Sequence, residues 1–102
     1  MSAFEGRLAC VIAADGSIAR GYKVASCERR GEHEYILTCE EPLQDAAKTN
    51  FSAVIGSAMY EDVEPGFCTV GLLEDAHAMR VCTYDVHGNP AARPFHLVIF
   101  RD

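Results

Sequence analysis

The sequence predicts an all-β protein: a two-layer antiparallel β-sandwich of jelly-roll or immunoglobulin-like type, with about seven strands, in a single domain covering residues 1–102. Apolar residues recur with a period of two rather than 3.6, and turn residues interrupt them about every ten residues. Only one short segment has a composition that favours helix. This combination favours two antiparallel sheets over a parallel α/β fold.

The first half of the chain is expected to contain three strands. The first covers residues 7–14 and ends at Asp15-Gly16, a dipeptide that supplies the positive φ of a tight turn. The second is long, residues 17–28, and contains Gly21, which within a strand suggests a bulge or a close backbone approach. A charged turn leads to the third strand, residues 34–40, where apolar and mixed positions alternate until Pro42 ends the pattern.

The second half is expected to contain four strands. Residues 43–50 favour helix, but eight residues after a proline are too few for a lasting one, so we expect a connection that crosses between the sheets. Strands are expected at residues 51–59, 67–73, 78–84 and 95–101. An acidic loop at 60–66, a turn at 74–77 and a loop at 85–94 separate them.

Charge and hydropathy exclude several classes of function. Nine basic residues against fifteen acidic ones give a formal charge of −6, which disfavours a nucleic-acid or anionic-membrane partner. No segment approaches the roughly 18 apolar residues that a membrane helix needs, and the first residues lack a basic region followed by an apolar one. We expect a soluble protein made in the cytoplasm without a signal peptide, which either stays there or reaches the exterior in a virion or by lysis.

The cysteines and histidines form no recognisable catalytic or metal-binding pattern. The five cysteines are widely spaced, with no pair two residues apart, and lie among apolar neighbours, as small buried thiols in a reducing compartment do. His33, His77 and His87 lie in loop sequences, whereas His96 alternates with apolar residues in the last strand. No metal or other cofactor is expected, and the absence of a catalytic motif predicts a protein that is not an enzyme.

Several turn and strand motifs occur in a familiar order. They are Asp15-Gly16, Gly21-Tyr22-Lys23-Val24, Gly31, Tyr35-Ile36-Leu37-Thr38, Glu41-Pro42-Leu43, Phe51-Ser52-Ala53-Val54, and the last two strands with their loop, from Val81 to Phe100. Over about residues 15–100 the chain thereby resembles the small C-terminal β-sandwich domains of bacteriophage tail fibres and of collagen-like surface proteins. The resemblance implies a trimer that attaches to a surface, often through loops at one end.

Two features depart from the pattern of that family. The spacing between Gly31 and Tyr35 is longer than usual, and five cysteines are more than expected. The shared motifs consist of turn and packing residues, so they imply assembly but supply no ligand.

The leading functional hypothesis is a non-enzymatic β-sandwich that self-associates, as a homotrimer, and that either caps a larger virion or surface assembly or binds a surface glycan. Candidate contact residues lie in two loops, where an aromatic ring can stack on a sugar and polar side chains can hydrogen-bond to it. They are Tyr60, Asp62, Asp85, His87 and Asn89. The alternative for these residues is that they are ordinary polar turns that contact only water.

Two other functions are consistent with the sequence. One is a small cytosolic ligand-binding barrel or enzyme that uses a buried cysteine and histidine, for instance Cys39 or Cys82 with His96. The other is an immunoglobulin-like interaction module inside a host cell, which shares the fold and differs in its partner.

Overall fold

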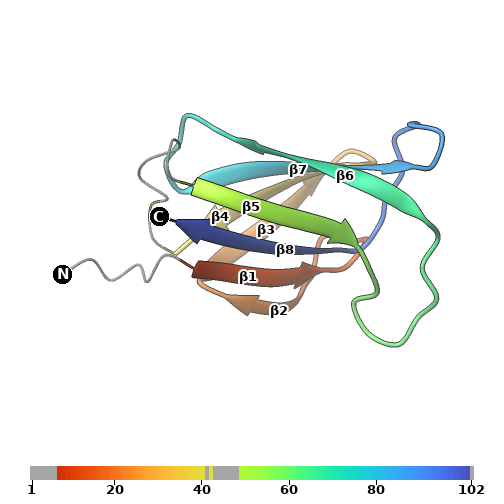
Figure 1. Ribbon diagram of the computed structural model, residues 1–102, viewed down its shortest axis with the longest axis horizontal. Coiled ribbons are helices and arrows are strands. Elements are labelled where there is room, and N and C mark those ends of the chain that lie inside the picture. The colour runs from red at the N-terminus through yellow and green to blue at the C-terminus, as the bar shows by residue number, and fades with distance from the viewer. Residues whose placement is uncertain (1–6, 41, 43–48, 102) are drawn as a thin grey trace.

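The computed structural model describes residues 7–40, 42 and 49–101, and within these residues every regular element is a β-strand. The strands form two four-stranded antiparallel sheets that pack against each other (Figure 1). The predicted all-β, two-layer antiparallel β-sandwich is therefore confirmed.

Each sheet is assembled from segments that are distant in the sequence. Sheet A has the order β2-β1-β8-β5, with β1 Arg7–Ile12, β2 Ile18–Tyr22, β5 Thr49–Ile55 and β8 Phe95–Arg101. Sheet B has the order β3-β4-β7-β6, with β3 Val24–Arg30, β4 Glu34–Cys39, β6 Gly66–Leu72 and β7 Ala78–Asp85. The centre of sheet A thus pairs the first strand with the last one.

The prediction of one long second strand at residues 17–28 is wrong. The structure divides this segment into β2 in sheet A and β3 in sheet B. The described residues therefore contain eight strands instead of the expected seven. The division lies at Lys23, whose φ of 71° is in the left-handed region that non-glycine residues rarely adopt. Gly21 does not mark the break. It does not mark the irregularity in the pairing of β1 with β2 either, because Val11 pairs with Arg20 and Ile12 with Ile18, so that the unpaired extra residue is Ala19.

The other strands agree with expectation except near their ends. The strand predicted at 51–59 begins at Thr49, so the last two residues of the predicted connection 43–50 are strand, and residues 43–48 lie outside the described residues. That strand ends at Ile55 because Ala58 and Met59 are held in a loop, where both backbone N–H groups donate to the Glu61 carboxylate at 3.0 and 2.8 Å.

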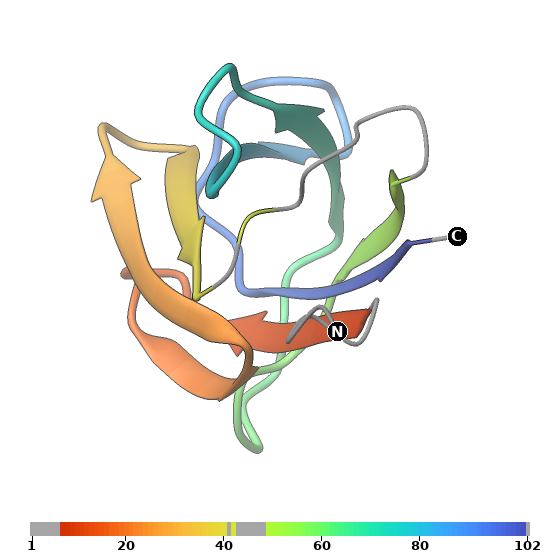
Figure 2. The ribbon, with the colours of Figure 1, turned by 90° about the vertical axis from the view of Figure 1, so that its left-hand side faces the viewer.

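The core lies between the inward faces of the two sheets, which Figure 2 shows from one end of the sandwich. Alternate residues of the central strands face it, as the period-two pattern requires. Across the core, the rings of Tyr35 in sheet B and Phe95 in sheet A meet edge to face with centroids 5.1 Å apart. The buried cluster comprises Leu8, Cys10, Ile12, Tyr35, Leu37, Cys39, Met79, Val81, Phe95, Leu97 and Ile99.

Tyr35 also joins the two sheets through a hydrogen bond. Its buried hydroxyl donates to the carbonyl oxygen of Ala14, just after β1, at 2.7 Å. In Tyr35→Phe this carbonyl loses its partner, so we expect the free energy of unfolding to fall by about 1 kcal/mol. Urea denaturation measures the difference, with Tyr22→Phe, an exposed tyrosine, as the control. Equal stability of Tyr35→Phe and the wild type would show that the hydrogen bond contributes nothing.

Candidate interaction surface

The outer face of sheet A is the most distinctive surface among the described residues. Side chains alternate along each strand, so the residues between the core positions point away from the core. The cross-strand register then aligns them in rows across the sheet. These outward residues are Arg20 and Tyr22 of β2, Arg7, Ala9 and Val11 of β1, His96, Val98 and Phe100 of β8, and Asn50, Ser52 and Val54 of β5.

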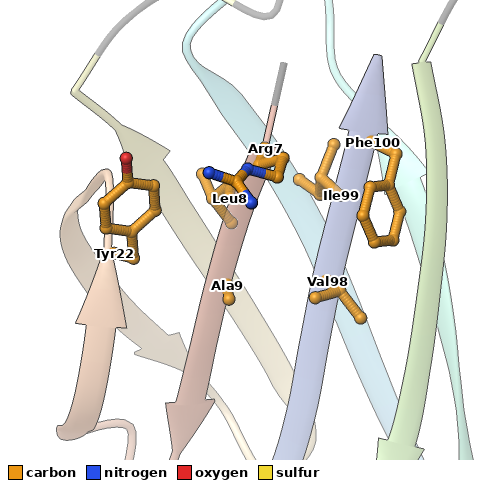
Figure 3. Close-up of a pocket in the computed structure, with 7 residues that line it drawn as sticks. All are labelled: Arg7, Leu8, Ala9, Tyr22, Val98, Ile99 and Phe100. Atoms are coloured by element: carbon orange, nitrogen blue, oxygen red, sulfur yellow. The ribbon is translucent and has the colours of Figure 1, made fainter. Parts of the chain in front are cut away.

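A shallow apolar groove crosses this face (Figure 3). Ala9 pairs directly with Tyr22 on one side and with Val98 on the other, and its small side chain leaves a hollow between larger neighbours. Tyr22 and Phe100 lie on opposite sides of Arg7 and Ala9. The side chains around the hollow are open to solvent: Tyr22 is 43% exposed, Val98 37% and Phe100 52%. A contiguous apolar surface is therefore available to a partner.

The groove continues toward His96 and is bounded there by the loop that follows β5. A second hollow shares Ala9, Tyr22 and Val98 with the first and extends past Val11 and Arg20 to His96. At that end the Nε2 atom of His96 lies 2.9 Å from the carbonyl oxygen of Ser57. The loop also passes so close that a Cβ atom on Gly56 would lie 2.9 Å from the His96 ring. His96 therefore packs against its own chain, and the Tyr22–Phe100 end remains open.

The charge of sheet A differs from that of the rest of the chain. Its four strands contain three arginines, of which Arg7 and Arg20 lie on the outer face, and no aspartate or glutamate. The remaining residues carry six basic groups against fifteen acidic ones, a formal charge of −9. Sheet A is thus a basic layer on an acidic protein.

The outer face of sheet B has a different character. Arg80 and Glu34 form an ion pair there at 3.4 Å, and Arg30 and Glu28 form another at 2.7 Å. At one end, Tyr84 stacks on Phe67 with ring centroids 5.2 Å apart. Charged side chains that pair with each other on a sheet surface are typical of a solvated face, so sheet A is the better candidate for an interaction surface.

The predicted contact residues fall into two separate groups. The loop that carries Tyr60 and Asp62 and the turn at 85–89 both extend from the same end of the sandwich, but they point to opposite sides of it in Figures 1 and 2. Tyr60 is 99% exposed. The structure therefore does not bring the five residues into one site, although each group remains open to solvent.

In the 85–89 turn, the polar side chains bind mainly the turn itself. The Asp85 carboxylate accepts hydrogen bonds from the backbone N–H of His87 at 2.8 Å and of Asn89 at 3.0 Å, and the Asn89 amide lies 3.4 Å from its other oxygen. These hydrogen bonds, those from Asn89 and His87 above all, lower the pKa of Asp85 below its ordinary value of 3.8. The structure thus assigns Asp85 and Asn89 a role in forming the turn. His87 takes part in these hydrogen bonds only through its backbone N–H, and both His87 and Asn89 are exposed.

The lowered pKa of Asp85 predicts an acid-dependent contribution to stability. A carboxylate whose pKa is depressed by folding stabilises the folded state above its unfolded pKa, and this is lost as the pH falls through its folded pKa. We expect the wild type to be more stable than Asp85→Asn at pH 7, and the difference to shrink once the pH drops below 3.8. Urea denaturation between neutral and acidic pH measures it, with Glu74→Gln as an exposed control. A difference that stays constant with pH would contradict the prediction.

The cysteines and the histidine of the alternative hypothesis are also separated. Cys39 faces the core from β4, and Cys82 lies on the outer face of sheet B between its cross-strand partners Glu34 and Thr69. His96 lies on the outer face of sheet A, on the far side of the sandwich, and packed sheets are about 10 Å apart. Neither thiol can therefore reach the imidazole. No three His, Cys, Asp or Glu side chains of the described segments are grouped as metal ligands.

Burial raises the pKa of the core thiols. It raises the pKa of Cys10 to about 12 and that of Cys39 to about 11, from an ordinary 9.0. Because the thiolate is the reactive form, a raised pKa leaves less of the reactive form at a given pH. We expect alkylation of Cys10 and Cys39 at pH 8 to be slow in the native protein and fast in denaturant, as mass spectrometry of the labelled peptides measures. Rapid native labelling of either residue would contradict this.

The described residues include no helix with the length and apolarity needed to cross a membrane. No family model matches the chain, and no curated protein or solved structure matches it significantly. The resemblance to tail-fibre and collagen-like surface domains therefore remains a prediction.

Proposed function

We propose that the protein is a non-enzymatic structural or attachment domain that self-associates, as a homotrimer, through the outer face of sheet A. One observation supports the proposal: sheet A has an exposed apolar groove and no acidic residue in its strands, whereas the outer face of the other sheet has two ion pairs. A small sandwich can bury such a face against copies of itself. The trimeric state and the role in a virion or surface assembly come from the family resemblance.

Attachment to a surface then falls to the 85–89 turn, which projects from one end of the sandwich. His87 is an exposed residue of this turn, and its imidazole can hydrogen-bond to a sugar. A glycan array probed with the purified protein tests this part of the proposal, with His87→Ala as the variant. Loss of an array signal in His87→Ala supports it, and an array with no signal for the wild type contradicts it.

Self-association is tested by the mass of the reduced protein in size-exclusion chromatography with light scattering. We expect the wild type to have the mass of three chains at low micromolar concentration. Val98→Glu places a charge in the groove and is expected to give a monomer, because a buried unpaired carboxylate costs several kcal/mol. Thr69→Glu, an equal charge on the exposed face of sheet B, is the matched control and should remain assembled. Circular dichroism verifies that both variants fold.

A wild type that remains monomeric up to high micromolar concentration would contradict the proposal. An assembled Val98→Glu together with a monomeric Thr69→Glu would place the contact on sheet B instead.

A further inference from the structure

The loop between β5 and β6, residues 56–65, is a chemical complement of the groove. It carries two exposed apolar side chains, Met59 and Tyr60, followed closely by the carboxylates of Glu61, Asp62 and Glu64. The groove has apolar walls, with the exposed Arg20 beside it. One chain thus contains both an apolar, acidic projection and an apolar, basic hollow.

Two of the three carboxylates hold the loop in shape. Glu61 accepts hydrogen bonds from the N–H groups of Ala58 and Met59, which lower the pKa of Glu61 below its ordinary value. Glu64 pairs with Arg93 at 3.2 Å, and the Arg93 side chain is only 13% exposed. Arg93 also reaches the carbonyl oxygen of Pro65 at 3.4 Å. The loop is therefore anchored at both ends, and the exposed Asp62 is left to meet a partner from a preorganised position.

The groove of the same copy does not receive this projection. Tyr60 is in contact with almost nothing, since 99% of its surface is exposed, and the open end of the groove is lined by Tyr22 and Phe100, away from His96 and the loop. An occupant of the groove must come from outside the chain.

We propose that the β5–β6 loop of one copy docks into the sheet A groove of a second copy, with Tyr60 in the apolar hollow and Asp62 paired with Arg20. This rests on the proposed self-association and specifies its contact. It is a head-to-tail contact between two different surfaces, which generates a ring when the rotation closes.

Charge favours this arrangement over the symmetric one. Two sheet A faces packed directly against each other would oppose basic residues with basic residues, since Arg7 and Arg20 lie on that face and its strands contain no carboxylate. The loop brings acidic groups to the basic layer instead, and like charges at an interface cost several kcal/mol whereas complementary ones speed association. Every copy also carries both the loop and the groove, so each loop can find a groove on another copy.

The first test exchanges the charges of the proposed pair. We expect Arg20→Glu and Asp62→Arg each to weaken association by about tenfold or more, as close interfacial charge pairs do, and the double variant to recover most of the wild-type affinity. Sedimentation equilibrium measures these affinities. Glu74→Arg reverses an exposed acidic residue outside the loop and is the matched control for the change in net charge. Two results would overturn the pairing. One is a double variant whose association is weakened by as much as the losses of the two single variants added together. The other is a Glu74→Arg variant that weakens association as much as Asp62→Arg does.

The second test mixes two damaged copies. Val98→Glu has an impaired groove and an intact loop, whereas Tyr60→Ala/Asp62→Arg has an impaired loop and an intact groove. In a head-to-tail contact one intact loop can still meet one intact groove, so the mixture should give a one-to-one heterodimer while each variant alone stays monomeric. The absence of a heterodimer would overturn the proposal.

These outcomes separate the loop contact from self-association in general. In one outcome the wild type is an oligomer and Val98→Glu a monomer, while the charge variants and the loop variant remain assembled. In that case the outer face of sheet A is the contact surface, but the loop is not what binds it. If the wild type is monomeric, and its groove instead binds a synthetic acidic, aromatic peptide of unrelated sequence, a different protein is the partner and both proposals fail.

Discussion

Phe95→Ala is expected to lower the free energy of unfolding by about 3–5 kcal/mol. Phe95 is fully buried and lies on β8, a strand that is flanked on both sides in sheet A, by Ile12 of β1 and by Ile55 of β5. Its ring also packs edge to face on Tyr35, so it is one of the contacts that hold the two sheets together. Truncation leaves a cavity between the sheets that the surrounding strands can fill only in part.

The expected loss is a large fraction of the stability of such a protein, since domains of this kind are stable by about 5–15 kcal/mol. Urea denaturation at submicromolar protein measures it without a contribution from assembly. Phe67→Ala is the matched control: the same atoms are removed from an exposed ring whose contact is with Tyr84, and about 1 kcal/mol is expected. Similar losses for the two variants would mean that Phe95 is not a core residue.

Gly66→Ala is expected to destabilise the protein by about 3 kcal/mol, the upper end of the usual range for forced overpacking. Gly66 opens β6 opposite Asp85, and a Cβ atom there would overlap the carbonyl oxygen of Tyr84. That oxygen belongs to the backbone of β7, where Tyr84 is paired with Phe67 of β6 on one side and bridged to Pro90 on the other, so it can move away only if this part of the sheet distorts.

Gly71→Ala is the control for this effect, because Gly71 lies in the same strand and a Cβ atom there meets nothing within 4 Å. Its stability should lie within about 0.5 kcal/mol of the wild type. Thermal unfolding of the two variants side by side measures the difference. A Gly66→Ala as stable as Gly71→Ala would contradict the close approach of β6 and β7 at Tyr84.

Much of the local structure follows from local sequence. The sequence predicts the strand at 95–101 with its observed bounds. A loop rich in proline and glycine marks its start, and the alternation of residues that follows indicates a strand. The 85–89 turn was predicted as a turn, and the hydrogen bonds of Asp85 explain why those residue types occur there. The candidate contact residues were chosen from the same turn chemistry, which does not distinguish a residue that binds a ligand from one that shapes the backbone.

The break at Lys23 shows where local reasoning fails. Nothing in the sequence around it is a strong turn signal, since lysine rarely takes a positive φ, and the apolar pattern continues across it. The chain turns there because β2 pairs with β1 and β3 pairs with β4, in different sheets. Such a change of sheet depends on partners that are elsewhere in the chain.

The candidate interaction surface depends on non-local pairing in the same way. The period of two in the apolar residues determines which residues of a strand share a face. The composition indicates an acidic protein with enough apolar residues for a sandwich. The fold class and the inward face could therefore be inferred from the sequence alone. The groove exists because register places Ala9 between Tyr22 and Val98, from three segments spread over the chain. Likewise, the arginines of the paired strands β1 and β2 lie beside the apolar residues of β8 only because β1 also pairs with the last strand. Strand partners and register are set by the packing of the whole core, and a linear pattern does not contain them.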